Sequence, residues 1–285
     1  NGKNQHVMFS ETDYSFIVLQ NSHTHDSEVE ADMYGALERG EFIPYYQPQY
    51  DLKTERIVSA EALVRWKSPD QGFLSPGEFI PLFEKNRFIV KLDQFMFTSV
   101  CGLLRQWLDA GIEPRPLSVN VSRMQFHTPD FVERYIRIKS QYAIPDGLLE
   151  LEFTESIFFD NVALLSSAVH ELRRAGIKCS IDDFGAGYSS LNVLKALPVS
   201  VLKLDGMFFR TAKDDEQAKI VIRNIMRMAG ELKMATVAEG VETHEQVAFL
   251  ETTGCDIIQG YVFARPMPAA EFTELLAGEG GHAER

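Results

Sequence analysis

The sequence predicts a (β/α)8 barrel with an irregular, antiparallel first strand, and three observations support this fold class. Short apolar runs alternate with helix-patterned segments along most of the 285 residues, as in parallel strands joined by right-handed crossovers. The runs consist mostly of Val, Ile, Leu and Ala, which indicates strands buried on both faces. Their number, seven or eight, and the chain length fit a closed barrel better than an open sheet.

The first two strands, expected at residues 42–50 and 57–66, should form a hairpin. Only residues 52–56 separate them, which is too short for a crossover helix, so the first strand should run antiparallel to the second. Ahead of this hairpin, residues 31–39 show helical spacing that ends at Gly40, a typical residue for a helix C-terminus.

From Ser75 onward the expected elements alternate regularly. The segment Ser75 to Glu78 precedes helical turns and a long helix near residues 91–110. The remaining strands are expected at residues 116–121, 148–153, 177–181, 199–204, 234–238 and 257–259. The remaining helices are expected at residues 129–141, 161–175, 190–197, 215–232, 243–253 and after residue 268.

Residues 31–275 are expected to form the barrel domain, with different segments on either side. Residues 1–30 hold one short apolar run and then a polar stretch without periodicity. We interpret them as the remnant of an upstream domain and a linker. Residues 276–285 are expected to be a disordered tail.

The composition excludes some classes of partner. Formal net charge is −13, so the chain is a poor candidate for binding duplex nucleic acid, and an anionic substrate would need metal ions to reverse the local field. No apolar stretch approaches the ~18–20 residues of a membrane-spanning helix, so we expect no membrane contact within this fragment. Cys101, Cys179 and Cys255 lie far apart in apolar contexts, which favours reduced core thiols and a cytoplasmic location.

Acidic, amide and amine side chains follow the apolar runs, where a barrel carries its catalytic groups. They are Glu61, Asn120, Glu152, Asp182, Asp183, Lys203, Asp205, Glu239 and Gln259, with Glu155 and Glu242 a few residues farther on. Carboxyl ends of parallel strands meet at one rim, so these side chains should converge. Glu155 is also open to a role in loop support, and Glu242 to one as an N-terminal charge of a helix.

Asp182 and Asp183 are the most informative pair. Two adjacent carboxylates repel each other, and burying one costs several kcal/mol unless a cation compensates. Oxygen ligands without histidine suit Mg²⁺ or Mn²⁺, and the carboxylates outnumber the needs of one ion. Together with Lys203 they predict phosphoester hydrolysis assisted by two metal ions. An enolase-like site, which also uses lysine and Mg²⁺, is the competing chemistry on these residues alone.

Eight motifs occur in a fixed order along the chain. They are Tyr46-Gln47-Pro48, Glu61-Ala62-Leu63 within Ser59 to Trp66, Asn120-Val121-Ser122, Glu152-Phe153-Thr154-Glu155, Asp182 to Ser190, Lys203-Leu204-Asp205, Ala238 to Thr243, and Gln259-Gly260-Tyr261. A lone Glu-Ala-Leu is uninformative, but the ordered set is specific. It resembles the EAL domain, a bacterial family of cyclic di-GMP phosphodiesterases, over about residues 31–275.

This resemblance implies a role for each matching position. The implied ligands of a first metal ion are Glu61, Asn120, Glu152 and Asp182, and those around a second are Asp182, Asp183 and Glu239. The implied residues near the attacking water are Lys203, Asp205 and Gln259. The implied substrate contacts, to guanine and phosphate, are Gln47 and Arg65. Glu155 matches a glutamate that anchors the loop at residues 183–190, which in the family couples metal binding to dimerisation.

The resemblance thus implies a homodimeric, TIM-like barrel that hydrolyses cyclic di-GMP to linear pGpG with two Mg²⁺ or Mn²⁺ ions. None of the matched positions departs from the family pattern. The alternative is a catalytically weak cyclic di-GMP receptor that signals to a partner protein. Asn1 to Phe9 also resembles the last strand of a GGDEF domain, which would make the chain part of a GGDEF–EAL protein whose upstream segments could anchor it to a membrane. An arbitrary linker is the other reading of those residues.

Overall fold

A computed structural model describes residues 29–30, 32–155, 157, 162–185, 194, 197–211 and 215–280. The described chain forms two compact units. One contains the residues up to Ile43 together with Arg65–Ile89, and the other contains Pro44–Val64 and the residues from Val90 onward.

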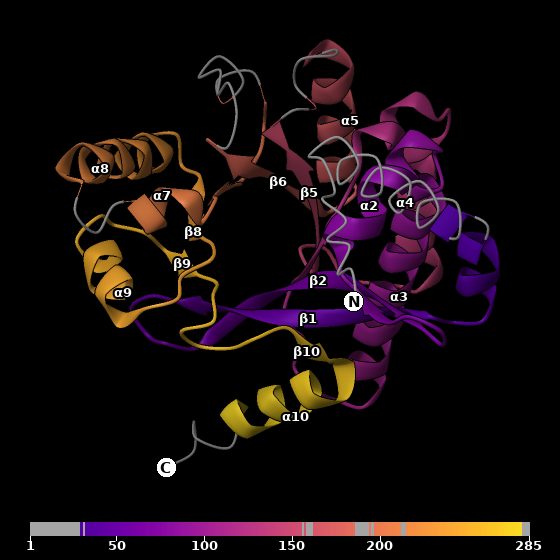
Figure 1. Ribbon diagram of the computed structural model, residues 1–285. Helices are drawn as coiled ribbons and strands as arrows, with labels where there is room; N and C mark the ends of the chain where they lie inside the picture. Colours follow the sequence, from indigo (N-terminus) through magenta and orange to yellow (C-terminus); the bar gives the residue numbers. More distant parts are fainter. Residues whose placement is uncertain are drawn as a thin grey trace, which may run out of the picture. The chain divides into compact units, whose positions relative to one another are not determined.

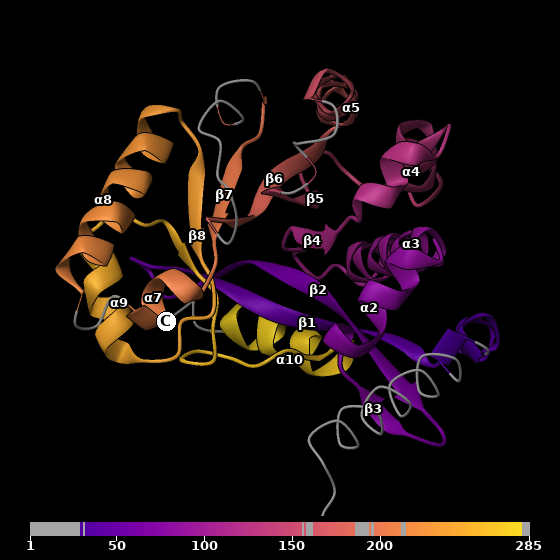
Figure 2. The ribbon, with the colours of Figure 1, turned by 45° about the horizontal axis from the view of Figure 1, so that its top comes forward.

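The larger unit holds a closed barrel, which among the described residues has eight strands (Figures 1 and 2). The strands are β1 (Phe42–Asp51), β2 (Ile57–Ser68), β4 (Leu117–Asn120), β5 (Leu149–Thr154), β6 (Ile177–Phe184), β7 (Val201–Leu204), β8 (Ala235–Ala238) and β9 (Ile257–Ile258). From β2 to β9 each strand is parallel to the next. β1 closes the barrel by pairing with β2 and, antiparallel, with β9. The predicted barrel and its antiparallel first strand are confirmed.

Helices connect the strands and cover the barrel. In the larger unit they are α3 (Ile89–Asp109), η1 (Arg123–His127), α4 (Phe131–Gln141), α5 (Val162–Arg174), α7 (Met207–Thr211), α8 (Glu216–Glu231), α9 (His244–Glu251) and α10 (Ala269–Gly280). A two-residue strand, β10 (Met267–Pro268), precedes α10 and pairs with β1. Within the described part of the chain, no helix is both long and apolar enough to span a membrane.

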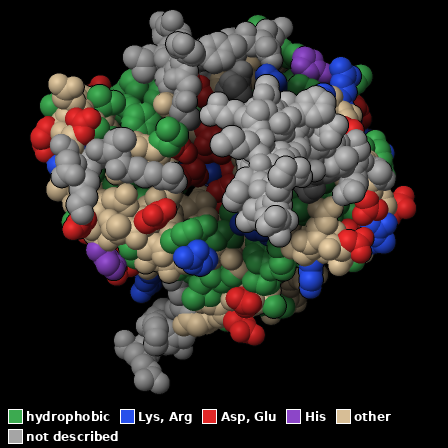
Figure 3. Space-filling model, in the orientation of Figure 1, with side chains coloured by type: hydrophobic (Ala, Val, Ile, Leu, Met, Phe, Trp, Pro, Cys, Tyr) green, Lys and Arg blue, Asp and Glu red, His purple; other side chains and the backbone are tan. Residues whose placement is uncertain are grey.

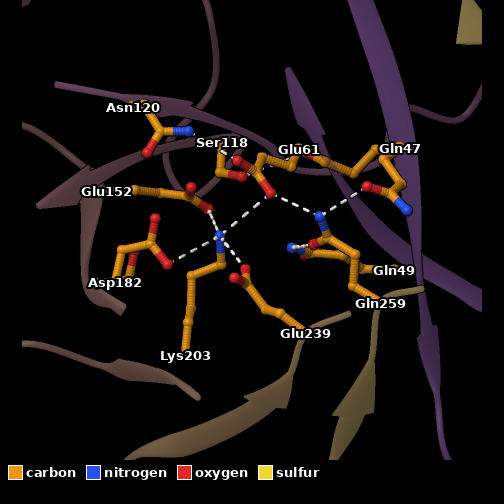
Figure 4. Close-up of polar contacts among 12 residues, drawn as sticks. Gln47, Gln49, Glu61, Ser118, Asn120, Glu152, Asp182, Lys203, Glu239 and Gln259 are labelled. Carbon is orange, nitrogen blue, oxygen red and sulfur yellow. Dashed lines mark hydrogen bonds and ion pairs between the residues drawn. The ribbon is translucent and has the colours of Figure 1, made fainter. Parts of the chain in front are cut away.

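The two-residue period of the strands separates an apolar layer from a polar interior. On β5, Leu149, Leu151 and Phe153 are at most 1% exposed and join the apolar core. The residue between the last two, Glu152, points instead into the barrel (Figure 4). On β1, the ring of Tyr46 stacks on Phe272 of α10, so its neighbours in the strand face the opposite way. On these two strands one face therefore packs in the apolar core, while the other supplies polar side chains to the barrel interior.

The smaller unit is built around an aromatic cluster. It contains helical residues 32–38, the strand β3 (Gly72–Leu74), which pairs with the end of β2, and the helix α2 (Pro76–Lys85). α2 begins with a capping box formed by Ser75 and Glu78. Its core rings are Phe42, Trp66, Phe79, Phe83 and Phe88. The indole of Trp66 donates to the Glu41 carboxylate at 2.9 Å, which satisfies its polar group inside the cluster.

The structure differs from the expected elements in several places. Helix α10 continues to Gly280, so residues 276–280 are helical and the expected tail at residues 276–285 is wrong for that part. β6 continues past Ile181 to Phe184. The short elements β3, η1, α7 and β10 were not predicted, because two to five residues carry too little periodicity to be recognised. The expected helix at residues 190–197 lies mostly outside the described residues. The upstream segment at residues 1–28 lies wholly outside them.

Gly260 is fixed by the backbone that lies against it. The carbonyl of Gln259 accepts from Val241 N at 3.2 Å, and Val241 O accepts from Val262 N at 3.1 Å. A Cβ added to Gly260 would lie 1.9 Å from Val241 O. We therefore expect Gly260→Ala to lower the free energy of unfolding by about 1–3 kcal/mol, measured by urea denaturation.

Gly230→Ala is the matched control, since nothing lies within 4 Å of a Cβ added there. This glycine belongs to α8, where alanine is expected to be neutral or to stabilise by up to about 1 kcal/mol. Parental stability in Gly260→Ala would contradict the close backbone approach.

Candidate active site

Side chains from seven neighbouring strands converge inside the barrel (Figure 4). They are Glu61 of β2, Asn120 of β4, Glu152 of β5, Asp182 of β6, Lys203 of β7, Glu239 directly after β8 and Gln259 directly after β9. These residues lie within their strands, as Glu61 does in β2, or directly after them, as Glu239 and Gln259 do, and the closed barrel brings them together. Figure 3 shows acidic side chains at the bottom of a recess in this face.

The Lys203 ammonium group lies at the centre of the carboxylates. Its Nζ is 2.6 Å from Glu152 Oε1 and 2.6 Å from Glu239 Oε1. Two further carboxylates are more distant, with Glu61 Oε2 at 3.3 Å and Asp182 Oδ1 at 3.7 Å. The lysine side chain is only 1% exposed. One cation thus faces four buried or largely buried carboxylates, and the ionised cluster keeps an excess of negative charge.

This excess of negative charge raises the pKa values of two of the carboxylates and of the lysine. Burial, and then repulsion from Glu61, raise the pKa of Glu152 well above its ordinary value. Burial and repulsion from Asp182 do the same to the pKa of Glu239. Burial alone would lower the pKa of Lys203, but the carboxylates, Asp182 foremost, raise it well above its ordinary value. The lysine is therefore held as a cation, and the cluster would accept more positive charge.

Glu61 differs from its neighbours because three groups favour its ionised form. Burial opposes ionisation, but attraction to Lys203 and hydrogen bonds from Gln259 and Asn120 bring its pKa below the ordinary value. Asn120 Nδ2 donates to one carboxylate oxygen at 2.7 Å, and Gln259 Nε2 donates to the other at 2.6 Å. Both oxygens of Glu61 are therefore fixed in direction.

A bulge in β6 brings Asp182 and Asp183 to the same side. In a regular strand, consecutive side chains point to opposite faces. Here the pairing with β7 shifts register between Ile181 and Phe184, and Asp183 has a φ of 53°, a left-handed conformation that aspartate tolerates better than most residues. Burial, and then the adjacent Asp182, raise the pKa of Asp183 to about 6. The bulge is what makes the aspartate pair usable as joint ligands.

The donor set fits two hard cations. Ligand oxygens of Glu61, Glu152 and Asp182 lie within 4.8 Å of one another, and so do those of Asp182, Asp183 and Glu239. Asp182 belongs to both groups. Both oxygens of Glu152 are buried and accept no hydrogen bond among the described residues. Its Oε1 forms an ion pair with Lys203 Nζ at 2.6 Å. A buried carboxylate in this condition suits a cation with oxygen ligands, such as Mg²⁺ or Mn²⁺.

Gln259 belongs to a hydrogen-bonded set of polar side chains, of which only Gln47 and Gln259 were predicted as site residues. Gln49 Nε2 donates to Gln259 Oε1 at 2.7 Å, and Ser59 Oγ donates to Gln49 Oε1 at 2.5 Å. Neither Gln49 nor Ser59 was among the expected site residues. The available signal was strand spacing, because Gln49 lies two residues after Gln47 and Ser59 lies two residues before Glu61.

Several expected site residues lie beside the cluster. Gln47 Nε2 donates to the Ala264 carbonyl and its Oε1 accepts from Gln259, both at 3.2 Å. Glu155 Oε2 accepts from Gly185 N at 3.0 Å. Gly185 is the last described residue before residues 186–190 of the expected loop, which lie outside the described residues. Asp205 Oδ1 accepts from Met207 N at 2.7 Å, at the start of α7.

Arg65 belongs to the smaller unit, so the structure does not place it relative to the carboxylates. Glu242 is exposed, and its backbone N–H donates to Gln246 Oε1 in the capping box of α9. Of the two readings left open for Glu242, its position agrees with that of a residue at a helix N-terminus.

Comparison with known proteins identifies the family. The EAL domain model matches residues 30–266. The chain is 38% identical over 231 residues to "Cyclic di-GMP phosphodiesterase PA2567" of Pseudomonas aeruginosa, covering 81% of this chain and 39% of that protein. It is 35% identical over 246 residues to "Bifunctional diguanylate cyclase/cyclic di-GMP phosphodiesterase MucR" of the same species, covering 86% of this chain and 36% of that protein. The chain therefore spans less than two fifths of the length of these curated relatives.

Solved structures agree with this assignment. "PaMucR Phosphodiesterase, c-di-GMP complex" aligns with a TM-score of 0.82 at 35% identity, covering 86% of this chain and 99% of that one. "Structure of EAL Enzyme Bd1971 - cAMP and cyclic-di-GMP bound form" aligns with a TM-score of 0.84 at 31% identity, covering 93% of this chain and 72% of that one. By family match, by sequence identity and by fold, the chain belongs to the EAL domain family.

Proposed function

We propose that the chain hydrolyses one phosphodiester bond of cyclic di-GMP, giving linear pGpG. The observation that carries the proposal is the pair of carboxylate groups that share Asp182, inside a barrel whose relatives are named as cyclic di-GMP phosphodiesterases. The solved PaMucR structure, which matches this chain over 86% of its length, is a complex with cyclic di-GMP. An acidic site can bind a bis-phosphate ligand only with added positive charge, which agrees with a metal-dependent reaction.

In this proposal the carboxylates hold two Mg²⁺ or Mn²⁺ ions. The first ion would be held by Glu61, Asn120, Glu152 and Asp182, and the second by Asp182, Asp183 and Glu239. When bound, such ions supply Lewis-acid activation of the phosphodiester and of the attacking water. Asn120 donates its amide N–H to Glu61, so the group that it would offer a cation is its carbonyl oxygen.

Lys203 is proposed to have two roles. It balances the charge of Glu152 and Glu239, each 2.6 Å from its Nζ, and its remaining N–H bonds can orient the attacking water or stabilise charge that develops on the phosphate. Asp205 and Gln259 are proposed to lie near this water. Because burial does not remove the charge of Lys203, it acts as a hydrogen-bond donor rather than a general base.

The proposed substrate contacts are Gln47 and Arg65, which match the substrate-binding positions of the family motifs. Gln47 would reach guanine after exchanging its 3.2 Å hydrogen bond to the Ala264 carbonyl for one to the base. Arg65 would contact a phosphate, which suits the planar fork of a guanidinium group. Glu155 would hold the base of the loop that follows Gly185 through its 3.0 Å hydrogen bond to that residue's N–H.

Assembly and context are likewise proposals. We propose a homodimer that forms through the region after Asp183, and a cytoplasmic location, which the three buried, free cysteines support. MucR is named as a bifunctional diguanylate cyclase and cyclic di-GMP phosphodiesterase, and this chain matches 36% of its length. This supports a GGDEF–EAL arrangement in which residues 1–30 connect an upstream domain to an EAL barrel at residues 31–275.

Removal of divalent metal ions is expected to stop turnover without unfolding the protein. Lys203 still compensates part of the carboxylate charge in the metal-free state. For each ion bound, free Mn²⁺ at 100 times the Kd of that position should add about 2.7 kcal/mol to the free energy of unfolding, measured by thermal unfolding with and without EDTA. Chromatography of pGpG measures turnover. If the folded, metal-loaded protein binds cyclic di-GMP but forms no pGpG, the receptor alternative is correct.

Glu61→Ala is expected to weaken Mn²⁺ binding and lower turnover at limiting Mn²⁺ by at least about 100-fold, since losing a ligand exceeds the 10–100-fold cost of losing a ligand's outer partner. Calorimetric titration and pGpG formation provide the two measurements. Glu242→Ala, which removes an exposed carboxylate outside the cluster, serves as control. Parental Mn²⁺ affinity in Glu61→Ala would refute the metal assignment.

Lys203→Met keeps a long side chain but removes the central ammonium group. The metal-free variant is expected to be destabilised by about 3–5 kcal/mol, because the remaining carboxylates lose their buried partner. Added Mn²⁺ should recover more stability in the variant than in the parent, while turnover stays low. Urea denaturation at several Mn²⁺ concentrations measures the recovery. The same metal-free stability in both proteins would show that the lysine does not compensate the cluster.

Cyclic di-GMP binding by metal-loaded Lys203→Met should fall much less than kcat, because the proposed role of the lysine is at the water. Equilibrium binding and initial rates on the same preparation make this comparison. An equal loss in both would place Lys203 at the substrate instead.

A further inference from the structure

A chain of side-chain hydrogen bonds connects β2, β1 and the end of β9, and returns to the carboxylate cluster (Figure 4). Ser59 Oγ donates to Gln49 Oε1 at 2.5 Å, and Gln49 Nε2 donates to Gln259 Oε1 at 2.7 Å. Gln259 Nε2 then donates to Glu61 Oε2 at 2.6 Å and to Gln47 Oε1 at 3.2 Å. The chain thus ends on a proposed metal ligand.

The carboxylate fixes the direction of every bond in this chain. An ionised carboxylate can only accept, so Gln259 must turn its NH₂ group toward Glu61 and its carbonyl toward Gln49. Gln49 must then turn its own NH₂ group toward Gln259 and its carbonyl toward Ser59, whose hydroxyl donates. In this arrangement every facing pair combines a donor with an acceptor.

The reverse arrangement of Gln259 would be costly. Gln49 and Gln259 are each only 4% exposed, so water cannot readily replace a lost partner. A buried acceptor left without a donor costs about 1–3 kcal/mol. A rotated Gln259 amide would also place its carbonyl oxygen where its NH₂ now meets Glu61 Oε2 at 2.6 Å, and two acceptors repel at that distance. The donor on Gln49 therefore helps to keep the Gln259 amide in the orientation that Glu61 needs.

Glu61 is held at both oxygens, by Asn120 at 2.7 Å and by Gln259 at 2.6 Å. Gln259, one of these two holders, is itself supported by a buried side chain, because its Oε1 accepts from Gln49 Nε2 at 2.7 Å. The ligand oxygen of Glu61 lies within 4.8 Å of those of Glu152 and Asp182. Rotation of its carboxylate plane would disturb this group.

We propose that Gln49 and Ser59 are positioning residues that hold Glu61, through Gln259, in the orientation in which it ligates a divalent cation. This inference rests on the metal site of the proposed function and deepens it. Among the described residues, the side-chain hydrogen bonds of Gln49 go to Gln259 and Ser59 rather than to a carboxylate. Gln49 acts by fixing which end of the Gln259 amide faces Glu61, and Ser59 acts in the same way on Gln49.

The test uses Gln49→Leu, which replaces the amide with an apolar side chain of similar size and so removes the donor. We expect its Mn²⁺ Kd, measured by calorimetric titration of the metal-free protein, to rise about 10-fold, the lower end of the usual cost of losing a ligand's outer partner. With Mn²⁺ at saturation, kcat should stay within about 3-fold of the parent, because the ligand itself is present. Ser59→Ala removes only the far end of the chain and should raise the Mn²⁺ Kd by a smaller factor.

A second readout needs no metal ion and no activity. The side-chain NH₂ resonances of Gln259 in a ¹⁵N–¹H spectrum of the metal-free protein can be identified by their loss in Gln259→Leu. They should shift in Gln49→Leu, because the amide loses the donor to its carbonyl.

Gln125→Leu is the matched control. Gln125 is a fully buried amide whose Nε2 donates to the Val90 carbonyl at 3.0 Å and to Asp93 Oδ2 at 3.1 Å. Its loss should lower stability without changing Mn²⁺ affinity or the Gln259 resonances. Parental Mn²⁺ affinity and unshifted Gln259 resonances in both Gln49→Leu and Ser59→Ala would overturn the proposal. If the parent protein forms no pGpG, the proposed hydrolysis fails, but the Mn²⁺ affinities still decide the role of Gln49.

Discussion

The contact between the Lys203 ammonium and the carboxylates around it is the interaction on which this barrel depends. Two carboxylate oxygens lie 2.6 Å from Nζ, and two more carboxylates lie within 3.7 Å. Without a cation, so many acids could share a buried space only in their neutral forms. The single positive charge of Lys203 compensates only part of the negative charge of the four carboxylates. The barrel can therefore fold without metal ions while its carboxylates keep an excess of negative charge.

The same balance explains why the interior combines ionic groups with amides. Amides add no charge, yet they can donate to a carboxylate and accept from a neighbour. Asn120 and Gln259 each donate to one oxygen of Glu61, and Gln49 extends the set toward β2. A carboxylate with both oxygens fixed is prepared for a ligand, since little side-chain freedom remains to be lost on binding. Glu152 differs, because its two buried oxygens accept no hydrogen bond among the described residues and its charge is compensated by Lys203, 2.6 Å from Oε1.

Local backbone geometry determines whether the sequence motifs can work together. Asp182 and Asp183 share one side of β6 only because the strand bulges there and Asp183 adopts a positive φ. Gly260 lets the backbone after Gln259 lie against the backbone of Val241. Val241 follows Glu239 by two residues, just beyond the end of β8. Both features lie at the end of the barrel where the polar side chains meet, which is where α/β barrels generally place strain and function.

The sequence by itself determined the barrel, its antiparallel first strand and the family. Apolar runs with a polar residue at one end are a local property, and parallel strands bring those ends together whatever their detailed packing. It did not determine short elements such as β3 and β10, which exist because a partner strand lies beside them. It also did not determine where Lys203 lies among the acids, how β6 turns Asp183, or that Gln49 supports Gln259. Those arrangements join residues that are far apart in the chain through directional hydrogen bonds and short-range charge, so only the tertiary structure could decide them.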